Sequence, residues 1–242
     1  MSTAVETIPL ANLALAFIPA AVVVVVLHIW SRDSIETLFA FARMVLQLAL
    51  IGYFLVFLFD TDHAAVVMAV LGVMVLASSW IALRTAKDQR KALYSLALAA
   101  IFIGGGSTLI VITQGVLNSD PWYAPRFLVP LAGMIFAASM NSVSLAAERV
   151  RAELGRGESY IDARSTALHA SLIPITNALF AVGLVSLPGM MTGQILSGVS
   201  PLVAARYQIM VMCMMFAASG LSASLFLLLA RNRLTQNPSS PR

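Results

Sequence analysis

The chain has 242 residues, of which 60% are hydrophobic and only 11% are charged, and its formal net charge is +4. A soluble domain of this length cannot keep so much apolar surface out of water, so the composition excludes one and predicts a polytopic membrane protein. The positive charge does not indicate a nucleic-acid partner, because the cations cluster at the ends of apolar segments, as membrane topology requires.

Seven apolar stretches approach the roughly 20 residues with which a helix crosses a lipid bilayer. We expect these spans, in chain order, at about 8–29, 41–59, 63–83, 93–115, 125–146, 168–187 and 203–230. The first carries Glu6, lacks a basic flank and is too long for a signal peptide, so we interpret it as a retained span. The predicted fold is therefore all-α, with one permease domain over residues 1–234 and a disordered polar tail at 235–242.

Basic residues predict the orientation in the bilayer. Thirteen of the fifteen lie in alternate connections or in the tail: Arg32, Arg43, Arg84, Lys87, Arg90, Lys91, Arg149, Arg151, Arg156, Arg164, Arg231, Arg233 and Arg242. Only Arg126 and Arg206 lie at the remaining connections, on the opposite side of the membrane. The positive-inside rule then places the N-terminus outside and the C-terminus in the cytosol of a plasma membrane, the inner membrane in a bacterium.

The Pro188–Gly189 pair lies inside an apolar stretch that runs from about 168 to 196. Proline cannot continue the helical hydrogen bonds, and lipid cannot satisfy the carbonyls that this frees. In transporters such interruptions often build the substrate path; the alternative is a helix that ends in a tight turn. Other candidates for the path or its gate are Arg43, Gln47, Asn141, Asn177, Ser186, Met190, Met191, Gln194, Tyr207 and Gln208. For most of the polar residues inside the spans, we favour the alternative that they bond one helix to another.

The connection at 147–166 is the only long charged stretch. Oppositely charged residues three or four positions apart, Glu148 with Arg151 and Arg149 with Glu153, predict a short helix that ends at Gly155. Its charges nearly cancel, which favours a site for docking a cytosolic protein over a lipid-surface anchor. The coupling residues would be Glu148, Glu153, Leu154 and Gly155. The alternative is a solvated loop with local ion pairs.

Catalytic motifs are absent from the sequence. The three histidines lie near span ends, and there is no phosphate-binding loop or nucleophile motif, so we expect a transport subunit rather than an enzyme. The energy for transport would come from a partner or an ion gradient. A gradient-driven carrier is disfavoured, because the inner parts of the spans contain few ionisable groups.

Two further patterns concern packing. Gly104–Gly105–Gly106 predicts a close approach of two helices. Methionines at positions 190, 191, 210, 212, 214 and 215, together with Cys213, offer soft ligands for an ion such as Cu(I). Methionine is also an adaptable packing residue, and we favour that interpretation, so no metal ligand is assigned.

Several blocks of sequence carry a resemblance to a known family. They are Ala181–Gln194, Ser200–Pro201 and Tyr207–Ile209, with shorter matches at Arg43, Gln47–Leu48, Gly52–Tyr53, Gly104-x-Gly106, Pro130-x-Ala-Gly-Met134, Leu154–Gly155 and Leu172-Ile-Pro174. In these residues the chain resembles the FetB/YbbM-type permeases, a group that includes plant aluminium-sensitivity membrane proteins. Members often carry an acidic residue and a lysine where this chain has Asn177 and Phe180.

The resemblance implies the permease subunit of an ABC transporter, acting as a homodimer with a separate cytosolic ATPase. ATP and Mg would be bound by that partner, and no cofactor is expected in this chain. The implied task in bacteria is export of iron, whereas plant relatives imply an organic solute such as a nucleotide sugar. A membrane scaffold that binds a cytosolic partner without transporting anything is a further alternative.

Overall fold

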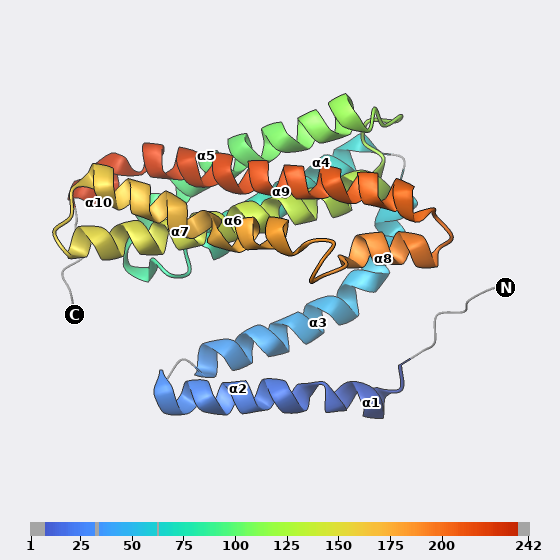
Figure 1. Ribbon diagram of the computed structural model, residues 1–242, viewed down its shortest axis with the longest axis horizontal. Helices are drawn as coiled ribbons and strands as arrows, with labels where there is room; N and C mark the ends of the chain where they lie inside the picture. Colours follow the sequence, from blue (N-terminus) through green and yellow to red (C-terminus); the bar gives the residue numbers. More distant parts are fainter. Residues whose placement is uncertain (1–7, 32–33, 62, 237–242) are drawn as a thin grey trace. The chain divides into compact units, whose positions relative to one another are not determined.

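The computed structural model describes residues 8–31, 34–61 and 63–236, and within these ranges the chain is helical with no strand (Figure 1). The contacts divide the chain into two compact units, Met1–Asp60 and Thr61–Arg242. Glu6, Arg32 and Arg242, on which parts of the sequence analysis depend, lie outside the described residues.

Six helical segments are long and apolar enough to cross a bilayer, which confirms a polytopic all-α membrane protein. They are Leu10–Trp30, Ser34–Phe59, Ala64–Ala82, Lys87–Val116, Pro125–Gly155 and Pro201–Leu229. The predicted span at 168–187 falls on α7 (Tyr160–Ala181), which is not among the six. Polar residues such as Arg164 and His169 interrupt the apolar character of α7, so the count of seven spans and the orientation remain predictions.

The first unit contains α1 (Leu10–Leu15), α2 (Phe17–Trp30) and α3 (Ser34–Phe59). A hydrogen bond between Nδ1 of His28 and the hydroxyl of Ser34, 2.9 Å apart, links the end of α2 to the start of α3. Most of the other described side chains of this unit are exposed and apolar, whereas Leu58 is fully buried. A helix that is apolar on all sides is typical of a segment surrounded by lipid or by other helices.

The second unit is built around two long helices, α6 (Pro125–Gly155) and α9 (Pro201–Leu229). Both α5 and α7 pack against this pair, α4 packs against α5 and α6, and α8 packs against α9. The remaining elements are α4 (Ala64–Ala82), the short helix η1 (Lys87–Gln89), α5 (Arg90–Ile110), the π-helix η2 (Val111–Val116), α8 (Gly189–Leu196) and α10 (Arg231–Gln236). Because α10 includes Thr235 and Gln236, the predicted disordered tail begins too early; residues 237–242 lie outside the described residues.

A tight crossing of α5, α6 and α9 fixes the middle of the second unit. A Cβ atom added to Gly104 would lie 2.6 Å from the hydroxyl of Ser222 and 2.7 Å from its backbone nitrogen. Ser222 donates to the hydroxyl of Ser139 (3.0 Å), which in turn lies within hydrogen-bond distance of the carbonyl of Ala218 (3.3 Å). The close approach predicted at Gly104 is thus confirmed, and its polar groups are paired inside the unit, as burial away from water requires.

Candidate functional site

The predicted helix break lies between α7 and α8. Helix α7 ends at Ala181, whose carbonyl accepts the backbone N–H of Val185 and Ser186. Gly183 has φ +84° and donates its N–H to the carbonyl of Ser186. A positive φ favours glycine, so Gly183 makes the turn. Pro188 has an extended backbone and is the N-cap of α8, so the Pro–Gly pair begins a helix rather than breaking one.

Backbone hydrogen bonds also define the C-terminal end of helix α8. Gly198 has φ +90°, and its N–H donates to the carbonyl of Ile195 while the N–H of Val199 donates to that of Gln194. These are the two bonds of a Schellman motif, which ends a helix with a left-handed glycine. Pro201 then opens α9 as its first residue, a position that suits proline. The chain from 181 to 201 is therefore a turn, an eight-residue helix and a second turn.

A pocket of about 540 Å³ lies where α6, α8 and α9 meet, and we call it the α6–α8–α9 pocket. The three helices contribute side chains at helical spacing, so that each presents one face to the cavity. Its lining consists of Leu117, Arg126, Phe127, Pro130, Leu131, Met134, Met190, Gln194, Val199, Val203, Tyr207 and Met210.

The α6–α8–α9 pocket brings together three of the predicted path residues, Met190, Gln194 and Tyr207. Gln208 is buried beside it on α9, and its Oε1 has no hydrogen-bond partner among the described residues. Of the remaining second-unit residues predicted, none lines this pocket: Asn141, Asn177, Ser186 and Gly189 are exposed, and Pro188 and Met191 are half-buried. Arg43 and Gln47 are exposed on α3 in the first unit.

Nine of the twelve lining residues were missed as site residues, among them Arg126, Pro130 and Met134 on α6, and Met210 on α9. The first three are spaced four residues apart and therefore share one face of α6. Pro130 also lies inside that helix, where it removes one backbone hydrogen bond. Helical spacing combined with an internal proline was the signal that could have identified them.

The chemistry of the α6–α8–α9 pocket is mostly apolar, with a few polar groups. Arg126, Gln194 and Tyr207 provide these groups, and no carboxylate or imidazole lines the pocket. The Oε1 atom of Gln194 is buried without a hydrogen-bond partner in the described part of the chain. Within the same part, no three His, Cys, Asp or Glu residues form a group that could hold a metal ion.

In the methionine-rich region of α9, some side chains are buried in the core and one lines the pocket. Met212 and Met214 are buried in the core, as the packing interpretation expects, and Cys213 is exposed. Met210 instead faces the pocket, where Met134 and Met190 also lie. The thioethers that share a cavity are thus contributed by three different helices.

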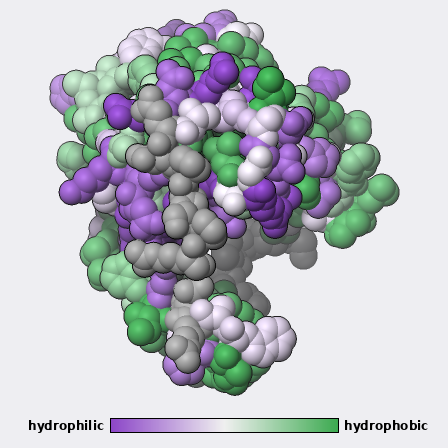
Figure 2. Space-filling model, turned by 90° about the vertical axis from the view of Figure 1, so that its left-hand side faces the viewer, coloured by the Kyte–Doolittle hydropathy of each residue, from purple (hydrophilic) through white to green (hydrophobic). Residues whose placement is uncertain are grey.

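The opposite end of α6 carries the charged groups and lies about 46 Å away along its 31 residues. We call this region the basic end: the α4–α5 connection, the α6–α7 turn and the start of α10. Figure 2 looks onto it and shows hydrophilic residues gathered there, with hydrophobic residues on its flanks. This distribution is typical of a helix bundle that leaves a bilayer at that end.

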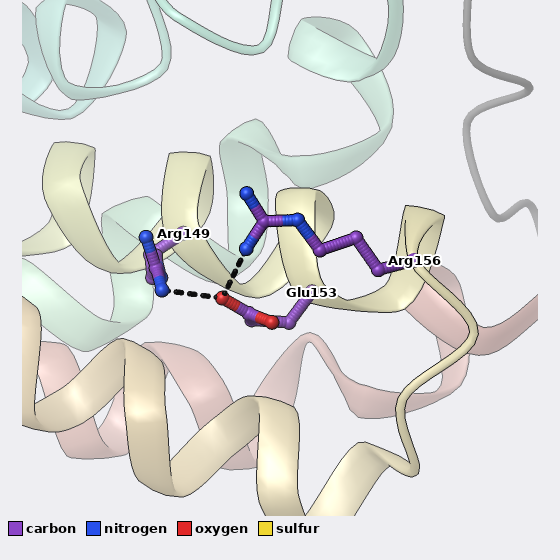
Figure 3. Close-up of polar contacts among 3 residues, drawn as sticks. All are labelled: Arg149, Glu153 and Arg156. Atoms are coloured by element: carbon purple, nitrogen blue, oxygen red, sulfur yellow. Dashed lines mark hydrogen bonds and ion pairs between the residues drawn. The ribbon is translucent and has the colours of Figure 1, made fainter.

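Glu153 organises the basic end. Its side chain is nearly buried, and its carboxylate lies 2.6 Å from Arg149 and 3.1 Å from Arg156 (Figure 3). The predicted i,i+4 pair of Arg149 and Glu153 is confirmed. Arg151, expected to pair with Glu148, instead lies 3.8 Å from the carboxylate of Asp88 in the α4–α5 connection. It thereby ties α6 to a segment far away in the sequence.

The α6–α7 turn has a defined conformation. Gly157 has φ +90°, its N–H donates to the carbonyl of Leu154, and the N–H of Glu158 donates to that of Glu153, which forms a second Schellman motif. Ser159 caps α7 by accepting the N–H of Asp162 and donating to its carboxylate. The predicted helix does end at Gly155. It is not a separate short helix, however, because α6 continues without interruption from the apolar span.

Tyr160 fastens the start of α7 to the end of α9. Its hydroxyl donates to the carbonyl of Leu227, and the guanidinium of Arg231 lies 5.8 Å from the centre of its ring. Burial raises the pKa of Tyr160 above its ordinary value of 10.0, and the nearby Arg164 and Arg231 oppose this rise. The hydroxyl therefore keeps its proton, which this hydrogen bond requires.

The fold and the two regions described above define an all-α, multi-pass membrane protein with a pocket at one end of its helix bundle and a structured charged turn at the other. Residues 10–235 match the family described as Uncharacterised protein family (UPF0014), and the chain belongs to that family.

Three relatives show how far the similarity extends. The chain is 37% identical to the UPF0014 membrane protein slr1647 of Synechocystis over 77% of its own length and 78% of the relative's. It is 30% identical to the "Probable iron export permease protein FetB" of Escherichia coli, covering 87% and 86% of the two chains. The chain is 29% identical to the protein ALUMINUM SENSITIVE 3 of Arabidopsis thaliana, over 78% of its own length and 73% of the relative's. No solved structure matches the chain.

Proposed function

We propose that this chain is the permease subunit of an ABC transporter that exports iron or another metal ion with energy from a separate ATPase. The observation that carries the proposal is the similarity to the Escherichia coli relative, whose name describes an iron export permease, over more than four fifths of both chains. The sequence has no phosphate-binding loop, so ATP and Mg would be bound by the partner. Two copies of the permease would form the translocation unit.

The α6–α7 turn is the surface that we assign to the ATPase. Residues 155–159 are all exposed, yet both helix ends beside them are closed by hydrogen bonds. Arg151 connects α6 to the α4–α5 connection through Asp88, and Glu153 pairs with Arg149 and Arg156 at the base of this turn. A surface that must pass a displacement to a helix has to be stiff, and these contacts provide that stiffness.

The α6–α8–α9 pocket is the segment of the path that we assign to the cargo. Helix α8, which is bounded by two turns, contributes Met190 and Gln194 to the lining of the cavity. A rearrangement of so short a helix would change the volume of the pocket without disturbing the α5–α6–α9 crossing. Nucleotide state in the partner would then bias the two arrangements.

One observation favours a second cargo class. The pocket lining includes Arg126 but no carboxylate, which hard metal ions prefer, and no imidazole, which suits iron, zinc and copper. An anionic organic solute would suit this lining better than a bare divalent cation. A permease for such a solute is therefore the alternative that the experiment has to separate from metal export.

The test measures metal content in cells that contain or lack this chain, each with its candidate ATPase, after loading with iron, copper, zinc or manganese. Lower cellular iron that requires both subunits and ATP hydrolysis is the expected result. A selective fall in copper would direct attention to the three pocket methionines instead. Unchanged metal content, with intact complex formation, would contradict metal export and favour the organic solute.

The docking assignment has its own test. Gly155→Leu adds a bulky side chain to the exposed last residue of α6, on the surface that we assign to the ATPase. We expect at least a tenfold loss of ATPase that co-purifies with the permease. Gly220→Leu is the matched control, because it makes the same change in α9 at a position whose added Cβ meets no atom within 4 Å. Equal co-purification of the ATPase with both variants would contradict the assignment of the α6–α7 turn as its docking surface. A membrane scaffold, the remaining alternative, would bind the ATPase but would show no transport.

A further inference from the structure

A second and larger cavity lies in the second unit, away from the α6–α8–α9 pocket. Its volume is about 1060 Å³, and its walls are formed mainly by α4 and α5, with η2 and two side chains of α6. Gly72 of α4 and Gly106 of α5 both line it, and a Cβ added to either would meet no atom within 4 Å. The two glycines therefore leave the cavity open where larger side chains would narrow it.

The wall of this cavity offers hydrocarbon along most of its length. Two of its hydroxyl groups are already used within their own helix: Ser107 donates to the carbonyl of Gly104 (3.2 Å) and Thr113 to that of Leu109 (2.9 Å). The other exposed polar side chains of the lining lie at its two ends: Ser95 of α5 at one, and the larger Gln114 of η2 with Trp122 at the other. A ligand that fits this distribution has a long apolar part and a polar part at the Gln114 end.

The cavity is too small to enclose a transmembrane helix. The cavity follows α5 from Ser95 to Ile110, which is about 22 Å of helix. A helix about 10 Å wide would fill 1060 Å³ within roughly 13 Å of its length, less than half of the ~30 Å hydrocarbon core. A hydrocarbon chain is much thinner and can extend along the whole cavity.

The surroundings indicate where such a chain comes from. Both α4 and α5 belong to segments apolar and long enough to span a bilayer. Phe102 and Ile103, at the edge of the cavity, are apolar and more than half exposed within the second unit, as is typical of side chains that contact lipid. Tryptophan is enriched at the boundary between hydrocarbon and headgroups, which is the depth that Trp122 indicates for the polar end of the cavity.

We propose that this cavity binds an acyl chain of a membrane phospholipid, with the headgroup at the end formed by Gln114 and Trp122. The lipid is a bound component and not one of the exchanging lipids around the protein, because it occupies space between α4 and α5. The proposal does not depend on the transported cargo or on the ATPase.

The test uses the full chain, purified in mild detergent, delipidated and incubated with palmitoyl-oleoyl phosphatidylethanolamine before detergent exchange. Native mass spectrometry then counts the phospholipid molecules that remain. Gly72→Leu and Gly106→Leu fill the cavity, and Gly220→Leu places the same side chain in α9 at an equally open position outside it. We expect each filling variant to retain at least fivefold less lipid than the wild-type protein, and the control to retain as much.

A second measurement needs no substitution. Phosphatidylethanolamine with a diazirine in its acyl chain should label peptides around Gly72 and around Gly106 after detergent exchange. Lipid retention that is equal in wild-type and filled proteins, or labelling confined to other helices, would overturn the proposal. So would a filled variant that lowers the dimer fraction in the same spectra while lipid retention stays constant, because the cavity would then be an interface between two copies.

Discussion

The two ends of α6 are built differently. At the basic end the carboxylate of Glu153 has two arginine partners, and the turn at Gly157 is closed by backbone hydrogen bonds. At the pocket end Pro130 interrupts the helical bonds, and Gln194 and Gln208 keep a buried oxygen without a partner in the described part of the chain. Arg149 and Arg151 at the basic end also keep a buried Nε without a partner in the described residues, but a carboxylate holds each guanidinium through another nitrogen. Side chains held by ion pairs keep one geometry, whereas unpaired ones lower the cost of changing it. Helix α6 therefore joins a fixed surface at one end to an adaptable one at the other.

The largest effect is expected in the crossing that separates these two ends. Gly104→Ala would place a Cβ 2.6 Å from the side chain and 2.7 Å from the backbone of Ser222, so the helices must move apart. We expect a loss of about 2–3 kcal/mol of unfolding free energy, as for overpacked cores. Gly106→Ala, two residues away, meets open space and should be neutral or slightly stabilising. Thermal unfolding in detergent measures both, and equal stabilities would show that the crossing is not rigid.

The next effect concerns the shape of the basic end. Gly157→Val forces a β-branched residue to adopt φ +90°, which costs about 1–3 kcal/mol or opens the turn. We expect lower stability and faster proteolysis between α6 and α7, detected by limited digestion. Gly189→Val is the control at the pocket end, since Gly189 has no positive φ and its added Cβ meets no atom. Similar digestion of the two variants would contradict the idea that the basic end is the fixed one.

A smaller effect is expected at Tyr160. Tyr160→Phe removes the hydrogen bond to the carbonyl of Leu227 and should cost about 1 kcal/mol at neutral pH. Because burial raises the pKa of Tyr160 above 10.0, the hydroxyl stabilises the folded protein below that pH, and this contribution is lost as the pH rises through the folded pKa. The stability difference between wild-type and variant proteins, followed by unfolding from pH 8 to 11, should therefore shrink above about pH 10. A constant difference would contradict this account.

The smallest change in stability should occur at the pocket end. Gln194→Met removes a buried oxygen that has no partner in the described part of the chain and keeps the side chain close in size, so stability should stay within about 0.5 kcal/mol or rise. Transport should fall several-fold, because one of the few polar groups of the pocket is lost. Thr192→Val on the exposed face of α8 is the control. A large loss of stability in Gln194→Met would place this residue in the structural core instead.

Much of the fold follows from local sequence patterns. Apolar length predicted the helices, and the helix end at Gly155 and the close approach at Gly104 were predicted correctly. The break after α7 was located, but it was attributed to Pro188–Gly189 when Gly183 makes the turn. Proline and glycine are compatible with both a break and a helix start, and only the hydrogen bonds of the neighbouring backbone distinguish these roles.

The site was predicted less completely. Met190, Gln194 and Tyr207 were identified near the break, yet Arg126 and Met134 come from a helix some sixty residues earlier. Similarly, Arg151 has an i,i+3 neighbour in Glu148 but lies beside Asp88 of another connection. Spacing along one helix describes which residues share a face, and it contains no information about the helix that this face meets.

The sequence by itself determined the class of protein, because hydropathy and span length respond to the bilayer and not to the fold. It also determined the family, through blocks that extend over most of the chain. Only the tertiary structure decided which helix faces enclose the two cavities and which charges meet at the basic end. Interhelical packing in a membrane depends on the shape of complementary surfaces, and shape arises only when helices distant in the sequence are brought together.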